Sequence, residues 1–172
     1  MGRFLMFLPV ALGLAASPAF SAEAGDPAAA AIGACLASYD AAAMREKADG
    51  APLKGATSYC TDKFFEACAE ARGWTQAAMT ECQGEAAGYW QAEVGRRTAA
   101  AKALGSPEID RWLETSAVSF EAYRRDRCGR FDMAEGSMYA AIREGCETDM
   151  ARERAEDLDD FLGSEPLIMK PE

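Results

Sequence analysis

Residues 120–158 read FEAYRRDRCGRFDMAEGSMYAAIREGCETDMARERAEDL, and this stretch decides how the chain folds. Cys128 and Cys146 each lie nine residues from Ser137, within a short interruption that also contains Met133 and Gly136. A disulfide across two antiparallel helices requires cysteines at equal distances from the turn. The symmetry therefore predicts a helical hairpin that is stapled by a Cys128–Cys146 disulfide.

The rest of the chain also has helical periodicity, and no segment alternates long enough to form a strand. Asp26, Thr75 and Ser106 are typical N-caps, and Gly73 is a typical helix stop. The expected helices cover about residues 26–47, 61–72, 75–104 and 106–130, with a last helix from the interruption to near Gly163. The predicted fold is all-α, a small disulfide-stapled helical bundle built from antiparallel helical hairpins.

The six cysteines constrain this bundle further. Residues 1–22 combine Arg3, an apolar run and small residues before Glu23, which predicts a secretory signal and hence oxidised cysteines. Cys60 and Cys68, on one helix, would be about 12 Å apart, too far for a disulfide. The simplest solution is the sequential pairing Cys35–Cys60, Cys68–Cys82 and Cys128–Cys146. The alternative joins Cys60 to Cys82 and Cys35 to Cys68.

Charge and export limit the partners. Removing residues 1–22 leaves 172 − 22 = 150 residues with a formal charge of 17 − 28 = −11, since Arg3 is lost from the 18 basic residues. No other apolar run is long enough to span a bilayer. The sequence predicts a periplasmic or secreted protein that avoids nucleic acid and favours cationic partners.

Residues suited to catalysis are missing. The chain has no histidine, no Cys-x-x-Cys pair and no glycine-rich phosphate loop, so neither an enzyme nor a cofactor or metal site is predicted. The acids of the last helix are interpreted as a solvated face rather than a cation site: Glu153, Glu156, Asp157, Asp159 and Asp160. Met133 and Met138 are interpreted as loop or core filling rather than soft-metal ligands.

The hairpin also predicts a charge register. If Cys128 lies opposite Cys146, residues whose numbers sum to 274 lie at equal height. The predicted ion pairs are Arg130–Glu144, Arg127–Glu147 and Arg125–Asp149. We favour these pairs over the alternative, an anion-binding patch formed by Arg124, Arg125, Arg127 and Arg130.

Several segments resemble the lysozyme inhibitor LprI N-terminal-domain family over about residues 68–162. Thr75-Gln76 with Met79 and Cys82 resembles its TQ-x-x-M-x-x-C segment, and Tyr123-Arg124 with Cys128 resembles its Y-R-x-x-x-C segment. The later matches, in order, are Gly136-Ser137, Cys146, Met150, Arg154 and Leu158. Phe120, Ala117 and Ala151 depart from the family, which has Trp, Gln and Thr at these positions.

Together with the signal pattern, the resemblance implies a division of the chain and a set of scaffold residues. The expected segments are a signal peptide (1–22), an N-terminal helical extension (23–66), a family-like domain (67–163) and a C-terminal tail (164–172). The expected scaffold residues are Thr75, Gln76, Met79, Phe120, Tyr123, Arg124, Arg154 and Leu158. Phe120 and Tyr123 are expected in the core, and Arg154 near Phe120 and Glu121.

Two functions are consistent with these observations. The first is an exported binding protein that inhibits a basic lysozyme-type enzyme, with the interhelical loop as the binding element. The expected binding residues are Phe131, Asp132, Met133, Glu135, Ser137 and Met138. The second is a non-catalytic envelope structural or assembly protein that docks a partner through an apolar helix face around Trp74, Tyr89 and Trp90.

Overall fold

The computed structural model describes residues 26–40 and 55–168. The predicted signal segment, residues 1–22, lies outside the described residues. The helices are α1 (Pro27–Ser38), α3 (Ala56–Ala71), α4 (Gln76–Lys102), α5 (Pro107–Gly129) and α6 (Ser137–Ile168), with a short 3-10 helix η1 (Arg130–Met133). No strand occurs in the described part of the chain, so the predicted all-α fold is confirmed.

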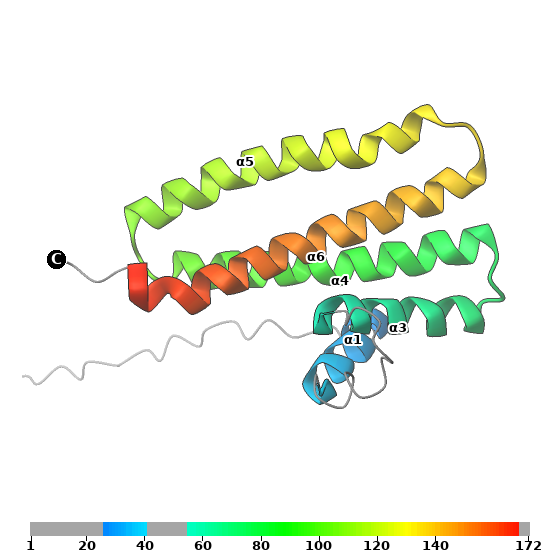
Figure 1. Ribbon diagram of the computed structural model, residues 1–172, viewed down its shortest axis with the longest axis horizontal. Helices are drawn as coiled ribbons and strands as arrows, with labels where there is room; N and C mark the ends of the chain where they lie inside the picture. The colour runs from blue at the N-terminus through cyan, green and yellow to red at the C-terminus, as the bar shows by residue number, and fades with distance from the viewer. Residues whose placement is uncertain (1–25, 41–54, 169–172) are drawn as a thin grey trace, which may run out of the picture.

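Two long helices form the centre of the bundle. α4 and α6 lie side by side over most of their length, and their contact is the most extensive between any two of the described helices (Figure 1). α5 lies on one side of this pair, and α1 and α3 lie on the other. The α3–α4 turn and the α5–α6 loop reach the same end of the bundle, so residues far apart in sequence meet there.

Local signals fix most helix boundaries. The side chains of Asp26, Thr75 and Ser106 accept hydrogen bonds from backbone amides of α1, α4 and α5, respectively, as predicted for N-caps. Gly73 ends α3 with φ 82°, a left-handed conformation that disfavours a side chain. These boundaries follow from the preferences of single residues.

Three boundaries differ from the sequence prediction. α1 ends at Ser38 rather than near Lys47, because Tyr39 leaves the helix with extended backbone; residues 41–47 lie outside the described residues. α3 begins at Ala56 rather than near 61, and its first turns pack against other elements. α6 continues past Gly163, which was expected to end it. Glycine costs only about 1 kcal/mol inside a helix, and Phe161 stacks on Trp112 in the turn before it.

The main core joins the N-terminal helices to the long helices. Trp90 of α4 is fully buried, and its indole N–H donates a 2.9 Å hydrogen bond to the Thr61 hydroxyl of α3. Ile32 of α1 and Phe64 of α3 pack into the same core, together with Ala155 of α6. The predicted boundary at residue 66 therefore lies inside α3, in a helix whose core is shared with the family-like region.

The three disulfides follow the sequential scheme. Cys35 is bonded to Cys60, Cys68 to Cys82 and Cys128 to Cys146, with Cα–Cα distances of 5.6, 5.9 and 5.7 Å. The alternative with Cys60 bonded to Cys82 is excluded in this structure. The first bond ties α1 to α3, the second ties α3 to α4, and the third ties α5 to α6.

Candidate functional site

The loop between α5 and α6 is a short connection. It begins as the 3-10 helix η1 and ends at Gly136, whose φ of 115° requires glycine. The side chain of Met133 is 83% exposed and that of Met138, in the first turn of α6, is 53% exposed. Glu135 and Ser137 are also exposed, so most of the predicted binding residues face solvent.

Covalent and ionic contacts hold this loop in place. The Cys128–Cys146 disulfide joins the helices on either side of it. Asp132 in the loop forms an ion pair of 3.3 Å with Arg143 of α6, and the Arg130 guanidinium lies 4.9 Å from the Phe131 ring centroid. A loop fixed in this way loses little conformational entropy when it binds a partner.

An apolar groove lies beside the loop, between α3, α4 and α6. It has a volume of about 390 Å³. Its lining residues are Phe65, Gln76, Met79, Gln83, Met138, Ala141, Ile142 and Gly145. The exposed Trp74 contacts one of these residues, with its ring edge-on to Phe65 at 6.0 Å. Exposed apolar side chains around a concave surface are typical of a protein-binding site.

A second hollow of about 370 Å³ adjoins the apolar groove and carries both signs of charge. The two share Phe65, Gln83, Ile142 and Gly145. The second also contains Phe131 from the loop and four charged residues: Asp62, Arg127, Arg130 and Asp149. Phe131 and Met138, at opposite ends of the loop, therefore each line one of the two neighbouring hollows.

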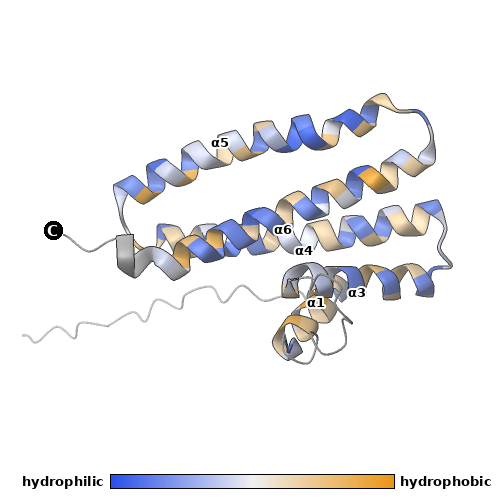
Figure 2. Cartoon of the chain, viewed as in Figure 1, coloured by the Kyte–Doolittle hydropathy of each residue, from blue (hydrophilic) through white to orange (hydrophobic). Residues whose placement is uncertain are grey.

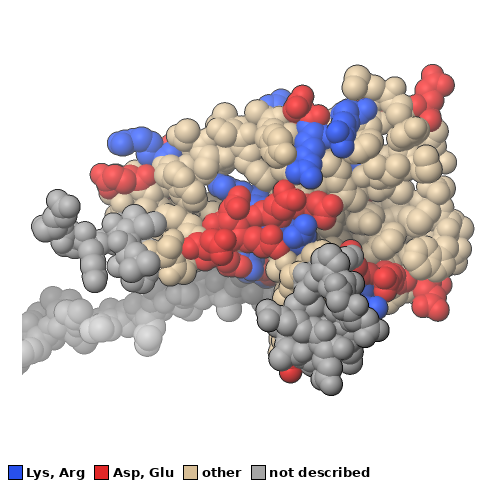
Figure 3. All heavy atoms as spheres, viewed as in Figure 1, with Lys and Arg blue, Asp and Glu red and all other residues tan. Residues whose placement is uncertain are grey.

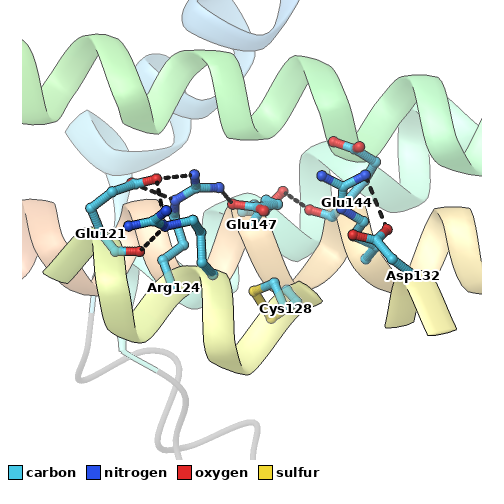
Figure 4. Close-up of polar contacts among 10 residues, drawn as sticks. Glu121, Arg124, Cys128, Asp132, Glu144 and Glu147 are labelled. Carbon is cyan, nitrogen blue, oxygen red and sulfur yellow. Dashed lines mark hydrogen bonds and ion pairs between the residues drawn. A yellow bond between two sulfur atoms is a disulfide. The ribbon is translucent and has the colours of Figure 1, made fainter. Parts of the chain in front are cut away.

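Arg124 forms ion pairs within α5 and across to α6, about one turn before Cys128. Its guanidinium lies between Glu121 of its own helix, at 2.6 Å, and the buried Glu147 of α6 (Figure 4). Hydrogen bonds to Glu121 and then to Glu147 raise the pKa of Arg124, and the hydrogen bond from Arg124 lowers the pKa of Glu121. This contact orients α5 against α6.

The predicted charge register is wrong in its partners. Arg125 pairs with Glu121, Arg127 with Glu153, and Glu147 with Arg124, while Arg130 faces the Phe131 ring. Equal height does not set the direction in which a helical side chain points. Arg124 lies four residues before Cys128 and so shares its face, whereas Arg127 is turned by about 100°. The four arginines of this segment nonetheless each contact an acid or, for Arg130, an aromatic ring.

Two of the scaffold residues on the hairpin behave differently from each other. Tyr123 is exposed, so its expected place in the core is wrong; it accepts a hydrogen bond of 3.2 Å from Arg127. Arg154 is buried and lies 5.7 Å from the Phe120 ring centroid, as expected, while its Nη2 donates to the Ser116 hydroxyl at 2.7 Å. Burial lowers the pKa of Arg154. Glu121 pairs with Arg124 instead.

The remaining scaffold residues have plain structural positions. Thr75 caps α4, Gln76 begins it, and Met79 lines the apolar groove. Leu158 is fully buried in a second core cluster with Ala101, Ile109 and Leu113. Phe120 is half-buried against the groove between α4, α5 and α6.

The aromatic helix face considered for the alternative function does not form. Tyr89 and Trp90 are buried in the core and only Trp74 is exposed. Trp74 instead contacts Phe65, which lines the apolar groove. α1 is mostly hydrophobic, whereas α5 mixes hydrophilic and hydrophobic residues along its length (Figure 2).

Acidic side chains gather along α6 on the face shown in Figure 3. In this segment Arg152 is bracketed by Asp149 at 3.3 Å and Glu156 at 2.9 Å. The described residues contain no cluster of His, Cys, Asp or Glu suited to hold a metal ion. Nor is any helix among them long and apolar enough to cross a membrane.

Sequence reasoning found the loop but missed the groove beside it. Phe65 and Ile142 come from different hairpins, and only the meeting of the α3–α4 turn with the α5–α6 loop brings them together. An available signal was that both connections lie at the same end of an antiparallel bundle. Which residues line the groove could be learned only from the packing of side chains in the structure.

Comparison with known proteins gives one result. The family model described as lysozyme inhibitor LprI matches residues 68–158, more than half of the 172-residue chain. The matched segment begins at Cys68 and ends at Leu158, so it includes the loop, two of the three disulfides and every lining residue of the groove except Phe65. No curated protein and no solved structure shows significant similarity to the chain.

Proposed function

Because the chain belongs to the lysozyme inhibitor LprI family, we propose that it is an exported binding protein that inhibits a basic lysozyme-type cell-wall hydrolase. The proposed contact surface is the α5–α6 loop together with the apolar groove. Export is supported by the signal pattern of residues 1–22 and by the use of all six cysteines in disulfides.

The observation that carries this proposal is the apolar groove beside a pre-formed loop. Met138 and Ile142 are exposed in a concave surface, and the adjacent loop is held by a disulfide and an ion pair. Binding energy in protein complexes is concentrated in a few apolar anchors that leave water completely. A convex apolar or aromatic side chain of the partner fits this groove.

The net negative charge supports a cationic partner. A mature formal charge of −11, with acids along α6, attracts a basic enzyme over the Debye length of about 10 Å at 0.1 M salt. Such attraction accelerates the encounter more than it tightens the complex. We therefore expect inhibition to weaken as salt rises, chiefly through a slower association rate.

The test is inhibition of a purified basic lysozyme by the oxidised mature protein at low ionic strength. Ile142→Asp places a charge in the groove at an exposed position of α6 and is expected to weaken inhibition at least about tenfold, which equals about 1.4 kcal/mol. The matched control is Val118→Asp on the middle of α5, which is 72% exposed and outside the groove.

Two results would remove the proposal. One is the absence of any effect of the mature protein on lysozyme activity. The other is equal inhibition by the Ile142→Asp and Val118→Asp variants, which would separate the activity from the groove. Circular dichroism of both variants verifies that they are folded.

A further inference from the structure

The geometry points to Met138 as a site whose oxidation makes the apolar groove more polar and so weakens binding there. The neighbouring Met133 can be oxidised too, but its sulfoxide lies outside the groove. The chemical part of this inference concerns the folded chain alone. Its consequence for a partner rests on the proposed function.

The methionines of the described region differ sharply in access to solvent. Met133 is 83% exposed and Met138 53% exposed, whereas Met150 in the core is 1% exposed. Met79 is half-buried in the floor of the apolar groove. Oxidation of a thioether by a peroxide requires direct approach to the sulfur. The expected order of oxidation is therefore Met133 first, Met138 next and Met150 last.

The reaction is balanced with hydrogen peroxide as the only co-reactant. The sulfur lone pair attacks one peroxide oxygen, the O–O bond breaks, and the released hydroxide takes the proton to form water. Sulfur is oxidised by two electrons to the sulfoxide and the peroxide is reduced to water. Methionine sulfoxide reductases reverse the step at the expense of a thiol reductant.

The two exposed methionines occupy different positions relative to the groove. Met138 lines it together with Phe65, Met79 and Ile142, so its sulfoxide places a strongly polar S=O group on an apolar surface. A partner side chain that enters the groove must then remove water from that oxygen without replacing its hydrogen bonds. Met133 does not line the groove, so its oxidation leaves the groove unchanged.

Oxidation also leaves the scaffold that holds the loop intact. The loop is fixed by Cys128–Cys146, by the Asp132–Arg143 pair and by Gly136, none of which involves a thioether. Cysteines in disulfides offer no thiolate to the oxidant at this end of the bundle. We therefore expect the sulfoxide to change binding and not folding.

The first experiment follows the chemistry without a partner. The mature protein is treated with hydrogen peroxide, the reaction is stopped with catalase, and the sulfoxide at each methionine is measured by peptide mass mapping. Met133 and Met138 should be oxidised several-fold faster than Met150 in the folded protein, and all three at similar rates in denaturant. Oxidation of Met138 no faster than Met150 would overturn the inference.

The second experiment follows the consequence. Oxidised wild type is expected to inhibit lysozyme at least about tenfold less than the untreated protein, and a methionine sulfoxide reductase should restore it. Met138→Leu keeps an apolar side chain that cannot form a sulfoxide, so oxidation should reduce its inhibition, relative to the untreated variant, by a smaller factor than in the wild type. For Met133→Leu the factor between the untreated and oxidised variant should be close to that of the wild type. Equal losses in both variants would overturn the assignment to Met138.

A third readout separates this inference from the proposed function. If the untreated protein does not inhibit lysozyme, that function fails, and the groove is then followed with the apolar dye anilinonaphthalene sulfonate. Dye fluorescence should fall on oxidation of the wild type and of Met133→Leu, and be retained by Met138→Leu. A fall of the same size in Met138→Leu would overturn control of the groove by Met138.

Discussion

At the scale of single residues, Glu147 depends on one cation. Its side chain is 10% exposed, and Arg124 is the only basic residue within ion-pair distance of it in the described chain. A buried carboxylate that loses its partner keeps the cost of desolvation. Removing Arg124 should therefore cost more stability than removing one partner of an exposed ion pair on the same hairpin.

We expect Arg124→Ala to lower the free energy of unfolding by about 1–3 kcal/mol, because Glu147 is left buried without a cation. Urea denaturation measures this change. The matched control is Arg125→Ala, whose side chain is 71% exposed and whose effect should stay within about 0.5 kcal/mol. Equal effects of the two substitutions would show that the Arg124–Glu147 contact does not orient the hairpin.

Glu121 gives the same contact a pH dependence. The hydrogen bond from Arg124 lowers the pKa of Glu121 in the folded protein below its usual 4.5. A group with a lowered folded pKa stabilises the protein above its unfolded pKa, and this stabilisation is lost as the pH falls through the folded pKa. Stability should therefore decrease below about pH 4.5 through this group.

Glu121→Gln removes that titration while keeping the shape of the side chain. We expect this variant to lose less stability between about pH 5 and pH 3 than the wild type does, as measured by thermal unfolding at each pH. Because Glu121 is substantially exposed, the difference should be small. Parallel pH profiles for the two proteins would contradict the assignment.

At the scale of elements, a disulfide joins α5 and α6 at the end of the hairpin that carries the loop. α5 contributes Ile109 and Leu113 to the second core at one end, and the Cys128–Cys146 disulfide holds its other end. Between these points, polar contacts of Arg124 and Arg154 take the place of an apolar seam. The disulfide is therefore the main restraint on the loop end.

Replacing Cys128 and Cys146 together by serine should lower stability by about 3 kcal/mol, given the sequence separation of 18 residues. It should also weaken inhibition, because the loop loses its fixed geometry. The control is the double replacement of Cys35 and Cys60 by serine, which destabilises α1 and α3 but leaves the loop intact. Loss of inhibition in both double variants at a temperature where both are folded would contradict this division.

At the scale of the whole molecule, the N-terminal helices share a core with the family-like region. Ile32 of α1 is fully buried with Trp90 of α4 and Ala155 of α6. Whether residues 23–66 form a separable extension, as the sequence predicts, stays a prediction. The shared core favours a single cooperative unit.

Ile32→Ala tests that cooperativity. The substitution should cost about 2–5 kcal/mol, because it leaves a cavity in the main core, and unfolding should remain a single transition. Calorimetry of the variant and the wild type distinguishes a single cooperative unit from N-terminal helices that unfold separately. A separate transition at low temperature, with the rest of the protein unchanged, would show that the N-terminal helices fold independently.

The helices and most of their caps follow from the sequence alone. The helix caps and stops depend on preferences that operate within a few residues, so they can be predicted without knowing the fold; examples are Asp26, Thr75, Ser106 and Gly73. The rise of a helix excluded a Cys60–Cys68 bond, and sequential pairing was the simplest scheme left, with Cys60–Cys82 and Cys35–Cys68 as the alternative; the structure has the sequential bonds.

The partners of charged side chains, the burial of Tyr89 and the composition of the groove depend on how the helices pack together. Arg124 rather than Arg127 meets Glu147, because side-chain direction depends on how two helices face each other and not on height alone. The groove likewise combines Phe65, Met79 and Ile142 from three helices. Contacts between residues distant in sequence are set by packing of the whole bundle, which no local pattern specifies.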